Sequence, residues 1–321
     1  MNDRVFTETL LAPGQVAATR TGAQALVDTL VDAGVEVIFG YPGGAVLPLY
    51  DALFSDTRLR HVLVRHEQAA VHAAEGYART TGKPGVVLVT SGPGMSNTTT
   101  GLLDALCDSV PVVCNRRQVA TALIGTDAFQ ECDALGISRP VTKWNAQVAR
   151  AEDVPALTRK ALTVATQGRP GPVLIDFPKD LQRATLPASA APQPAAAAAP
   201  AQLPLANLRK AAALIAQAKR PVFYGGGGLI NSGPAACGAF TRLVKLTGAP
   251  CTLTLMGLGA FPGSDGQFLG MLGMHGTLEA NLAMHRSDLV ICVGARFDDR
   301  VTGRLEGFCP GATKPALDID P

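Results

Sequence analysis

Glu67 is the residue whose type and position suggest chemistry most directly, because it is a lone carboxylate between a strand-like run and a helix-like run. Residues 61–64 are apolar enough for a strand, and the alanine-rich segment that starts at Glu67 is typical of a helix. A carboxylate at such a junction can exchange a proton with a bound ligand. The ordinary alternative is that its charge interacts favourably with the positive end of the helix dipole. Glu67 taken alone is compatible with both roles.

Two histidines near Glu67, His66 and His72, raise the question of a metal site. A helical zinc motif of the HExxH type needs two imidazoles one helical turn apart. His66 and His72 are too far apart in the sequence for that spacing. We therefore expect no metal ligands in this chain.

Glycine-rich turns follow several strand-like runs, at the positions where parallel α/β sheets bind ligands. Gly92-Pro93-Gly94 follows one run and Gly225–Gly228 follows another. Neither has the third glycine of the dinucleotide-binding fingerprint, so each is a weak signal by itself. Residues 294–300 close a third run with charged side chains. They form either a solvated strand end with ion pairs or part of a cofactor site.

Composition restricts the class of protein. The chain has 321 residues, 47% of them hydrophobic and 17% charged, which is typical of globular domains with large cores. A net charge of +2 without a basic, aromatic stripe gives no reason to expect nucleic acid. Seven cysteines without a C-x-x-C pair favour buried thiols in a reducing compartment. No apolar run is long enough for a membrane span and no signal peptide is evident, so we expect a cytoplasmic protein.

Strand-like and helix-like segments alternate along the chain, which predicts an α/β fold with two doubly wound parallel-sheet domains. We expect a first domain at 1–185, an Ala/Pro-rich linker at 186–204 and a second domain at 205–321. Between the strands, apolar residues at helical spacing, as at 23–31, predict helices packed on a core. The expected strands cover residues 35–40, 86–90, 111–114 and 172–176, and then 221–224, 289–293 and 316–320.

The order of the motifs along the chain is more specific than any single motif. From about residue 20 onward, they resemble those of the acetolactate synthases (acetohydroxyacid synthases), which depend on thiamine diphosphate. Residues 127–131 and 296–300 point to this group within the wider thiamine-diphosphate family. The set consists of Tyr41-Pro42-Gly43-Gly44, Arg65-His66-Glu67-Gln68, Thr90-Ser91-Gly92-Pro93-Gly94, Asp127-Ala128-Phe129-Gln130-Glu131 and Arg169-Pro170-Gly171-Pro172-Val173, followed by residues 255–259, 273–276 and 294–300.

The resemblance implies a role for each matched residue. The first domain would bind the aminopyrimidine of thiamine diphosphate, with Glu67 as the carboxylate that hydrogen-bonds N1′. Gly44, Pro93, Asn97 and Gln130 would lie near that ring or the substrate channel, where Gln130 orients substrate and Phe129 forms an apolar wall. The second domain would hold FAD, which carries out no net redox chemistry in this family. The matching flavin contacts are Arg169, Gly225, Gly226, Gly227, His275, Gly276, Gly294, Arg296, Asp298 and Asp318.

The resemblance also implies a reaction and partners. Two pyruvates would condense to 2-acetolactate and CO2, or pyruvate and 2-oxobutyrate to 2-aceto-2-hydroxybutyrate, in branched-chain amino-acid biosynthesis. Large subunits of this family form dimers or tetramers and bind a small regulatory subunit. Two alternatives remain: a non-catalytic flavin-binding or subunit-interaction homologue, and a related decarboxylase of 2-oxo acids.

Two departures from the family qualify this interpretation. The family holds Mg2+ in a third domain through a Gly-Asp-Gly…Asn motif. The only similar triplet here is Ser264-Asp265-Gly266, so we expect that domain to be missing and the chain alone to be inactive. Arg116-Arg117 also stands before Gln118, where the family has a small residue and Gly. Two arginines at the end of an apolar strand are difficult to bury without partners.

Overall fold

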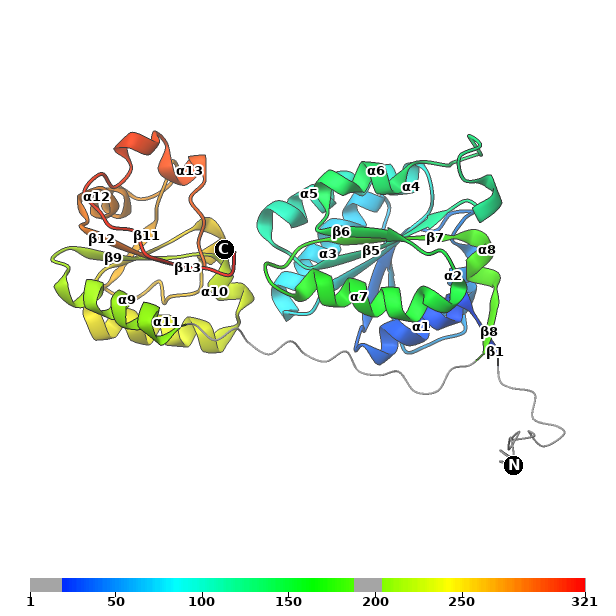
Figure 1. The fold of residues 1–321 in the computed structure, drawn as a ribbon, viewed down its shortest axis with the longest axis horizontal. Helices are drawn as coiled ribbons and strands as arrows, with labels where there is room; N and C mark the ends of the chain where they lie inside the picture. The colour runs from blue at the N-terminus through cyan, green and yellow to red at the C-terminus, as the bar shows by residue number, and fades with distance from the viewer. Residues whose placement is uncertain (1–18, 188–203, 321) are drawn as a thin grey trace, which may run out of the picture.

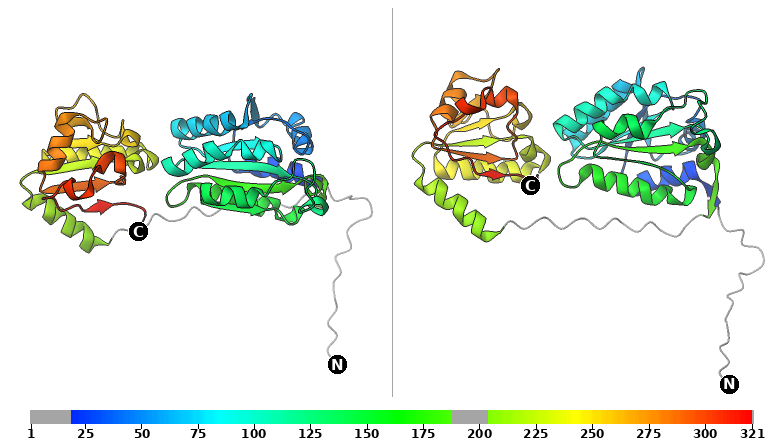
Figure 2. Two further views of the ribbon diagram at one scale, coloured as in Figure 1. Left: turned by 90° about the horizontal axis from the view of Figure 1, so that it is seen from above. Right: turned by 45° about the horizontal axis from the view of Figure 1, so that its top comes forward.

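The structure, a computed structural model, describes residues 19–187 and 204–320. These residues form two α/β units, each built on a parallel sheet with helices on both faces (Figures 1 and 2). The predicted fold class of two doubly wound parallel-sheet domains is confirmed. Within the described residues, no helix combines the length and the apolar character needed to cross a bilayer.

The first unit contains a six-stranded parallel sheet in the order β3-β2-β4-β5-β7-β6. Its strands are β2 (Val37–Gly40), β3 (Arg60–Leu63), β4 (Gly85–Val89), β5 (Val112–Gln118), β6 (Trp144–Gln147) and β7 (Val173–Pro178). Its helices are α1 (Gly22–Asp32), α2 (Leu47–Phe54), α3 (Glu67–Thr81), α4 (Pro93–Ser96), α5 (Thr99–Asp108), α6 (Ala134–Ser138), α7 (Val154–Thr166) and α8 (Lys179–Arg183). Residues of α1, α2 and α7 cover one face of the sheet, and residues of α3, α5 and α6 cover the other.

A separate two-stranded ribbon joins the ends of this unit. Strand β1 (Thr19–Thr21) pairs antiparallel with β8 (Thr185–Pro187). The first unit therefore continues past the predicted boundary at 185, because Leu186 and Pro187 belong to β8. Residues 188–203 of the predicted linker lie outside the described residues.

The second unit contains a five-stranded parallel sheet in the order β11-β10-β9-β12-β13. Its strands are β9 (Pro221–Gly225), β10 (Cys251–Leu253), β11 (Phe268–Met271), β12 (Leu289–Val293) and β13 (Ala316–Leu317). Its helices are α9 (Leu205–Gln217), α10 (Gly227–Asn231), α11 (Pro234–Thr247), α12 (Leu278–Arg286) and α13 (Asp299–Thr302). The predicted strand at 316–320 is shorter than expected, since the chain leaves the sheet after Leu317.

Each sheet has a point at which the chain reverses its direction of travel across the strands. In the first sheet this point lies between β2 and β4, and in the second it lies between β9 and β12. The loops that leave the carboxyl ends of neighbouring strands run there to opposite faces. In open α/β sheets this position, called the crevice below, is where ligands usually bind. The glycine-rich turns noted in the sequence follow these four strands.

Candidate functional site

Glu67 lies at the first residue of α3, just after β3, and is only 8% exposed. His66 caps the helix, because its Nδ1 accepts a hydrogen bond from the backbone N–H of Gln68 at 3.2 Å. The side-chain amide of Asn97 donates to Glu67 Oε2 at 2.9 Å. One carboxylate oxygen is therefore fixed by the segment that follows β4, on the same face of the sheet as α3, and Oε1 is left for a ligand. The position at a helix start suits the charge as well, so the two roles considered for Glu67 are compatible.

The loops after β2 and β4 meet beside this carboxylate. A Cβ added to Gly43 would lie 2.6 Å from Thr90 Cβ, and one added to Gly94 would lie 2.6 Å from Thr90 Cγ2. The same added Cβ on Gly94 would stand 3.4 Å from Glu67 Oε1. Side chains at these glycines would therefore fill the space in front of the carboxylate. Gly44 is exposed, with no atom within 4 Å of the position of an added Cβ.

Gln130 reaches the same place from a loop that is distant in the sequence. Gly92 has φ +56°, and a Cβ there would lie 2.7 Å from the carbonyl oxygen of Gln130. The carboxylate of Glu131 accepts hydrogen bonds from the backbone N–H groups of Gly125 and Ala128, which closes the loop on itself. These bonds hold the pKa of Glu131 below its usual range. The loop thereby presents Gln130, in a left-handed conformation with φ 59°, beside Gly92.

The remaining site residues of the first unit differ in exposure. Pro93 is exposed at the start of α4, next to Gly94. Phe129, next to Gln130 in the chain, is 88% exposed. Glu67, Asn97, Pro93 and Gln130 are thus brought to one edge of the sheet, and the apolar wall expected from Phe129 stays a prediction.

Strand β5, which runs beneath this edge, contains two fully buried arginines. Arg116 donates to Asp176 Oδ1 at 2.5 Å and to the carbonyl oxygen of Cys132 at 3.3 Å. Arg117 projects to the opposite face, where its guanidinium lies 4.8 Å from the centre of the Phe177 ring. None of its three nitrogens has a hydrogen-bond partner among the described residues. Burial lowers the pKa of Arg117 to about 9. The sequence raised the difficulty of burying two arginines without partners. Arg116 has partners in the structure, and Arg117 has no hydrogen-bond partner among the described residues.

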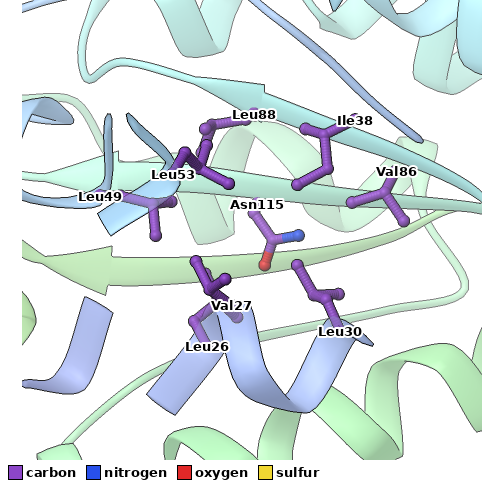
Figure 3. Close-up of a pocket in the computed structure, with 9 residues that line it drawn as sticks. All are labelled: Leu26, Val27, Leu30, Ile38, Leu49, Leu53, Val86, Leu88 and Asn115. Atoms are coloured by element: carbon purple, nitrogen blue, oxygen red, sulfur yellow. The ribbon is translucent and has the colours of Figure 1, made fainter. Parts of the chain in front are cut away.

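Asn115, two residues before Arg117, is a second polar residue of β5 on this face. Its side chain points into a small apolar space in the core (Figure 3), and neither its amide nitrogen nor its amide oxygen has a partner among the described residues. The residues around it are Leu26, Val27, Leu30, Ile38, Leu49, Leu53, Val86 and Leu88.

The glycines of the second unit mainly allow two loops to approach each other. A Cβ on Gly226 would lie 2.3 Å from the carbonyl oxygen of Gly294, and Gly294 itself has φ +58°. The backbone N–H of Gly228 donates to the same carbonyl oxygen at 2.9 Å. Gly225 is buried at the end of β9, and Gly227 is partly exposed at the start of α10. Close packing of backbone fixes the rim of the crevice between β9 and β12.

Charged and polar side chains gather along that rim. The phenol of Tyr224 donates to the carbonyl oxygen of Arg296 at 3.0 Å, and the Arg296 side chain is exposed. Asp298 caps α13 by accepting from the N–H groups of Arg300 and Val301. His275 is exposed and Gly276 is partly exposed. Their loop is held beside α13, because Met274 N–H donates to the carbonyl oxygen of Arg300 at 2.8 Å. Asp318 follows β13 and is exposed.

Arg169 differs from the other predicted flavin contacts because it belongs to the first unit. Its Nε donates to Ser109 Oγ at 2.7 Å, and its Nη2 donates to the carbonyl oxygen of Cys107 at 3.3 Å. Its Nη1 lies 3.4 Å from Asp320 Oδ2, just beyond β13. The side chain thus lies near the carboxyl end of the second sheet, although most of its hydrogen bonds anchor it to the end of α5.

Sequence reasoning missed Thr90 and Glu131 as individual contributors to the site. The side chain of Thr90 touches both glycine turns, and its buried hydroxyl has no partner among the described residues. Both residues belong to quoted motifs, so the signal was present. Their roles depend on contacts between loops, which spacing along the chain does not reveal.

Comparison with known proteins agrees with this geometry. The N-terminal TPP binding domain of thiamine pyrophosphate enzymes matches residues 20–137, and the central domain of the same enzymes matches residues 208–321. The acetolactate synthase large subunit of Haemophilus influenzae is 52% identical over 309 residues, covering 94% of this chain and 53% of the relative. The isozyme 3 large subunit of Escherichia coli is 50% identical over 308 residues, with the same two coverages.

An archaeal relative gives a similar result. The probable acetolactate synthase large subunit of Methanocaldococcus jannaschii is 49% identical over 305 residues, covering 94% of this chain and 51% of the relative. The chain spans about half the length of the curated relatives it matches. The two matched domains and these relatives show that the chain belongs to the thiamine pyrophosphate enzyme family, as a homologue of acetolactate synthase large subunits.

Proposed function

We propose that this chain forms the aminopyrimidine-binding and flavin-binding part of an acetolactate synthase large subunit. The observation that carries the proposal is the buried carboxylate of Glu67, held by Asn97 at the reversal point of the first sheet. The relatives are named for this activity along their whole length, and the chain corresponds to about half of it.

The residues around Glu67 fit thiamine diphosphate. Glycines at 43 and 94 keep the space before the carboxylate clear, and the buried Thr90 hydroxyl is available to a polar ring atom. When bound, thiamine diphosphate supplies a nucleophilic carbon and an electron sink for a 2-oxo acid. With that cofactor bound, Glu67 Oε1 would share a proton with N1′ of the aminopyrimidine, while Asn97 would keep Oε2 occupied and the carboxylate correctly oriented. Gln130, whose backbone lies beside Gly92, would orient the substrate.

The rim of the second crevice fits FAD through the chemistry of its side chains. Arg169, Arg296 and His275 offer nitrogen donors for a diphosphate, and Asp318 offers an acceptor for a ribose hydroxyl. The turns at Gly225, Gly226, Gly227, Gly276 and Gly294 pack closely against neighbouring segments and so would shape the rim that the flavin contacts. Asp298 shapes the loop by capping α13. The flavin has a structural or regulatory role in this proposal.

Among the described residues, the triplet most similar to the Gly-Asp-Gly…Asn magnesium motif of the family does not form a site suited to Mg2+. Asp265 of the Ser264-Asp265-Gly266 triplet is paired with Lys245 at 2.5 Å and accepts from Gln267 N–H at 3.1 Å. We place the Mg2+ ligands in the half of the relatives to which this chain does not correspond.

The proposed reaction is the condensation of two pyruvates to 2-acetolactate and CO2, or of pyruvate with 2-oxobutyrate to 2-aceto-2-hydroxybutyrate. This reaction belongs to branched-chain amino-acid biosynthesis. We further propose assembly as a homodimer or homotetramer of large subunits with a small regulatory subunit, since several relatives are named large subunits.

The proposal is tested by joining the chain after Pro321 to the corresponding C-terminal half of the Escherichia coli relative and assaying the fusion with thiamine diphosphate, Mg2+ and FAD. We expect 2-acetolactate from pyruvate. Glu67→Gln should lower kcat by about 100-fold or more, because an amide cannot share a proton with N1′. Exchange of the cofactor's C2 proton, followed by NMR, should slow in parallel.

A matched control is Glu152→Gln, which changes an exposed glutamate two residues before α7, away from the residues proposed to bind either cofactor. This variant should keep the parent rate. An unchanged C2 exchange rate in the Glu67→Gln fusion would remove Glu67 from the mechanism. Acetaldehyde in place of acetolactate would instead favour a decarboxylase.

A further inference from the structure

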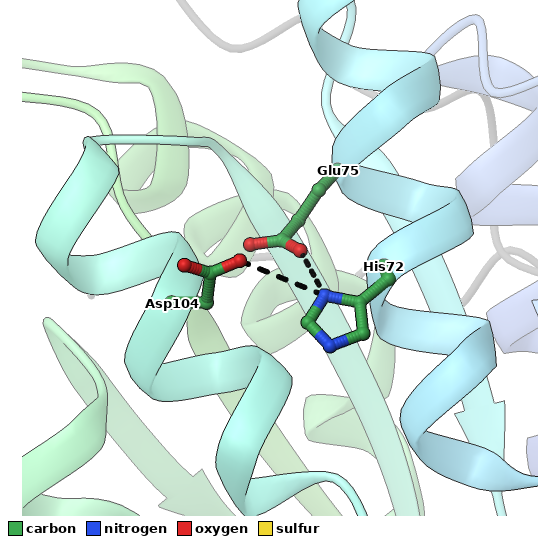
Figure 4. Close-up of side chains that lie close together, drawn as sticks. All are labelled: His72, Glu75 and Asp104. Carbon is green, nitrogen blue, oxygen red and sulfur yellow. Dashed lines mark hydrogen bonds and ion pairs between the residues drawn. The ribbon is translucent and has the colours of Figure 1, made fainter. Parts of the chain in front are cut away.

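Three potential metal ligands meet on the surface of the first unit, away from the two crevices. His72 and Glu75 come from α3, and Asp104 comes from α5 (Figure 4). Residues three apart on a helix lie on the same face, so His72 and Glu75 point together toward the neighbouring helix. One ligand atom from each residue lies within 4.8 Å of the other two.

The geometry is close to that of a three-ligand site. His72 Nδ1 is 2.7 Å from Glu75 Oε2 and 3.6 Å from Asp104 Oδ2. Ligand atoms held at 2.0–2.1 Å by a tetrahedral ion are about 3.3 Å apart. Small side-chain rotations would therefore place all three atoms at bonding distance from one ion. The exposure of Asp104 and His72, at 51% and 41% of their side chains, provides an entry path for the ion.

A second observation points to a missing cation. The Glu75 side chain is only 5% exposed, and its Oε1 has no hydrogen-bond partner among the described residues. Figure 4 shows this carboxylate directed at the space between His72 and Asp104. A buried carboxylate with an unsatisfied oxygen beside a second carboxylate is stabilised by a positive ion.

We propose that His72, Glu75 and Asp104 bind a divalent transition-metal ion of the zinc type. An imidazole nitrogen among the ligands favours Zn2+, Co2+ or Ni2+ over Mg2+ and Ca2+, which prefer oxygen ligands alone. The outer nitrogen of His72 lies 3.4 Å from the side-chain amide of Gln68, which can orient the ring from behind. The HExxH spacing excluded in the sequence does not apply here, because the ligands come from two helices.

The position of the cluster gives the ion a structural role. It would join α3, which begins at Glu67, to α5, which follows Asn97 by two residues. The hydrogen bond between Asn97 and Glu67 links the starts of the same two segments. An ion at His72, Glu75 and Asp104 would therefore clamp the two helices one to two turns beyond the proposed catalytic carboxylate.

The test is a titration of the full 321-residue chain, stripped of metal with a chelator and carrying Cys107→Ser to remove the exposed thiol. Cobalt chloride is followed by visible absorption, and zinc chloride by competition with bound Co2+. We expect one saturable site per chain that excess Mg2+ or Ca2+ does not displace. His72→Asn and Asp104→Asn should each weaken the site by about 100-fold or more, since even losing a supporting contact costs up to that much.

Matched controls are His285→Asn and Asp51→Asn, which change exposed residues on other helices. Both should leave the dissociation constant unchanged. Backbone hydrogen exchange of α3 and α5 should slow when Zn2+ is added to the parent and should not change when Zn2+ is added to Asp104→Asn. Because the Asp104 side chain is exposed, this variant should fold like the parent. Equal dissociation constants for the parent, His72→Asn and Asp104→Asn would overturn the proposal, as would tighter binding of Mg2+ than of Zn2+.

Discussion

Replacing Arg117 with methionine is expected to stabilise the first unit, although the change removes a charged side chain. The guanidinium is fully buried and none of its nitrogens has a hydrogen-bond partner among the described residues. Leaving a buried charge without a partner costs about 3–5 kcal/mol. The contact with the Phe177 ring at 4.8 Å offsets about 2 kcal/mol of this cost. Methionine fills a similar volume without the charge, so we expect a net gain of about 1–3 kcal/mol.

The neighbouring arginine provides a control of opposite sign. Arg116→Met removes an equally buried guanidinium that is paired with Asp176, and Asp176 is itself 1% exposed. Among the described residues, Gln147 Nε2 at 2.8 Å and Gln118 Nε2 at 3.4 Å would be the side-chain donors left to that carboxylate. Arg116→Met should therefore destabilise the first unit by about 3–5 kcal/mol.

Urea unfolding followed by tryptophan fluorescence measures both variants in the correct unit, because Trp144 is the single tryptophan and lies in β6. The melting temperature should shift by about 2–4 °C per kcal/mol for a unit of this size. If Arg117→Met lost as much stability as Arg116→Met, Arg117 would have a partner in solution, and the argument from its unpaired nitrogens would be refuted.

Three further predictions concern Arg117, Asn115 and Cys107. The stability advantage of Arg117→Met should shrink as the pH rises from 8 to 10, because burial lowers the pKa of Arg117 to about 9. Above pH 9 the Arg117 guanidinium loses its proton in the folded wild type but keeps it in the unfolded chain, so the free energy of unfolding of the wild type rises with pH. Unfolding curves of both proteins at pH 8 and pH 10 check this. Asn115→Leu should stabilise the first unit by about 1–3 kcal/mol, since both polar atoms of the amide lack partners; a decrease in the urea midpoint would contradict it. Cys107 is the one exposed cysteine of the seven. A thiol reagent at pH 8 should therefore detect one fast-reacting group per folded chain. Cys107→Ser should abolish that fast phase, and a fast phase that persisted in this variant would contradict the prediction.

The strands most clearly predictable from the sequence are those buried on both faces. Runs such as 86–89 and 289–293 are continuously apolar, as central strands of parallel sheets require, and they correspond to β4 and β12. Strand β2, which is only partly buried, was also predicted, at 35–40. Strand β6 was missed because its residues, Trp144–Gln147, are only partly buried and half polar. Strands β10 and β11 are too short to stand out from their surroundings.

Strand β5 illustrates a different limit of sequence reasoning. The prediction ended it at Cys114, since a run of Asn115-Arg116-Arg117-Gln118 does not suit the interior. The structure continues it through Gln118, with every residue buried. The acid that makes Arg116 tolerable is on β7, in register with it across the sheet. A compensation of this kind exists only after folding and leaves no local pattern.

Some features of the candidate site could also be predicted from local sequence, and others depend on contacts between distant segments. Glu67 could be located from local signals, because a strand end and a helix start are both visible in the sequence. Its hydrogen bond to Asn97 joins two segments that β4 separates along the chain, and no periodicity predicts that contact. The resemblance to a known family implied only that both residues lie near the same ligand, and the functional roles of the residues remain predictions.

The ribbon of β1 and β8 has a consequence for the order in which the protein is completed during synthesis. Thr19 pairs with Pro187, and Gly22 N–H donates to the carbonyl oxygen of Ala184 at 3.0 Å, so the first turn of α1 is docked on residues made much later. A Cβ on Gly22 would lie 2.2 Å from the carbonyl oxygen of Leu181, which makes that docking intolerant of any side chain. The start of the first unit must therefore wait for almost the whole unit to leave the ribosome before it can close. Because long-range closure is slow and costly in entropy, we expect the first unit to be the part of the nascent chain most dependent on chaperones.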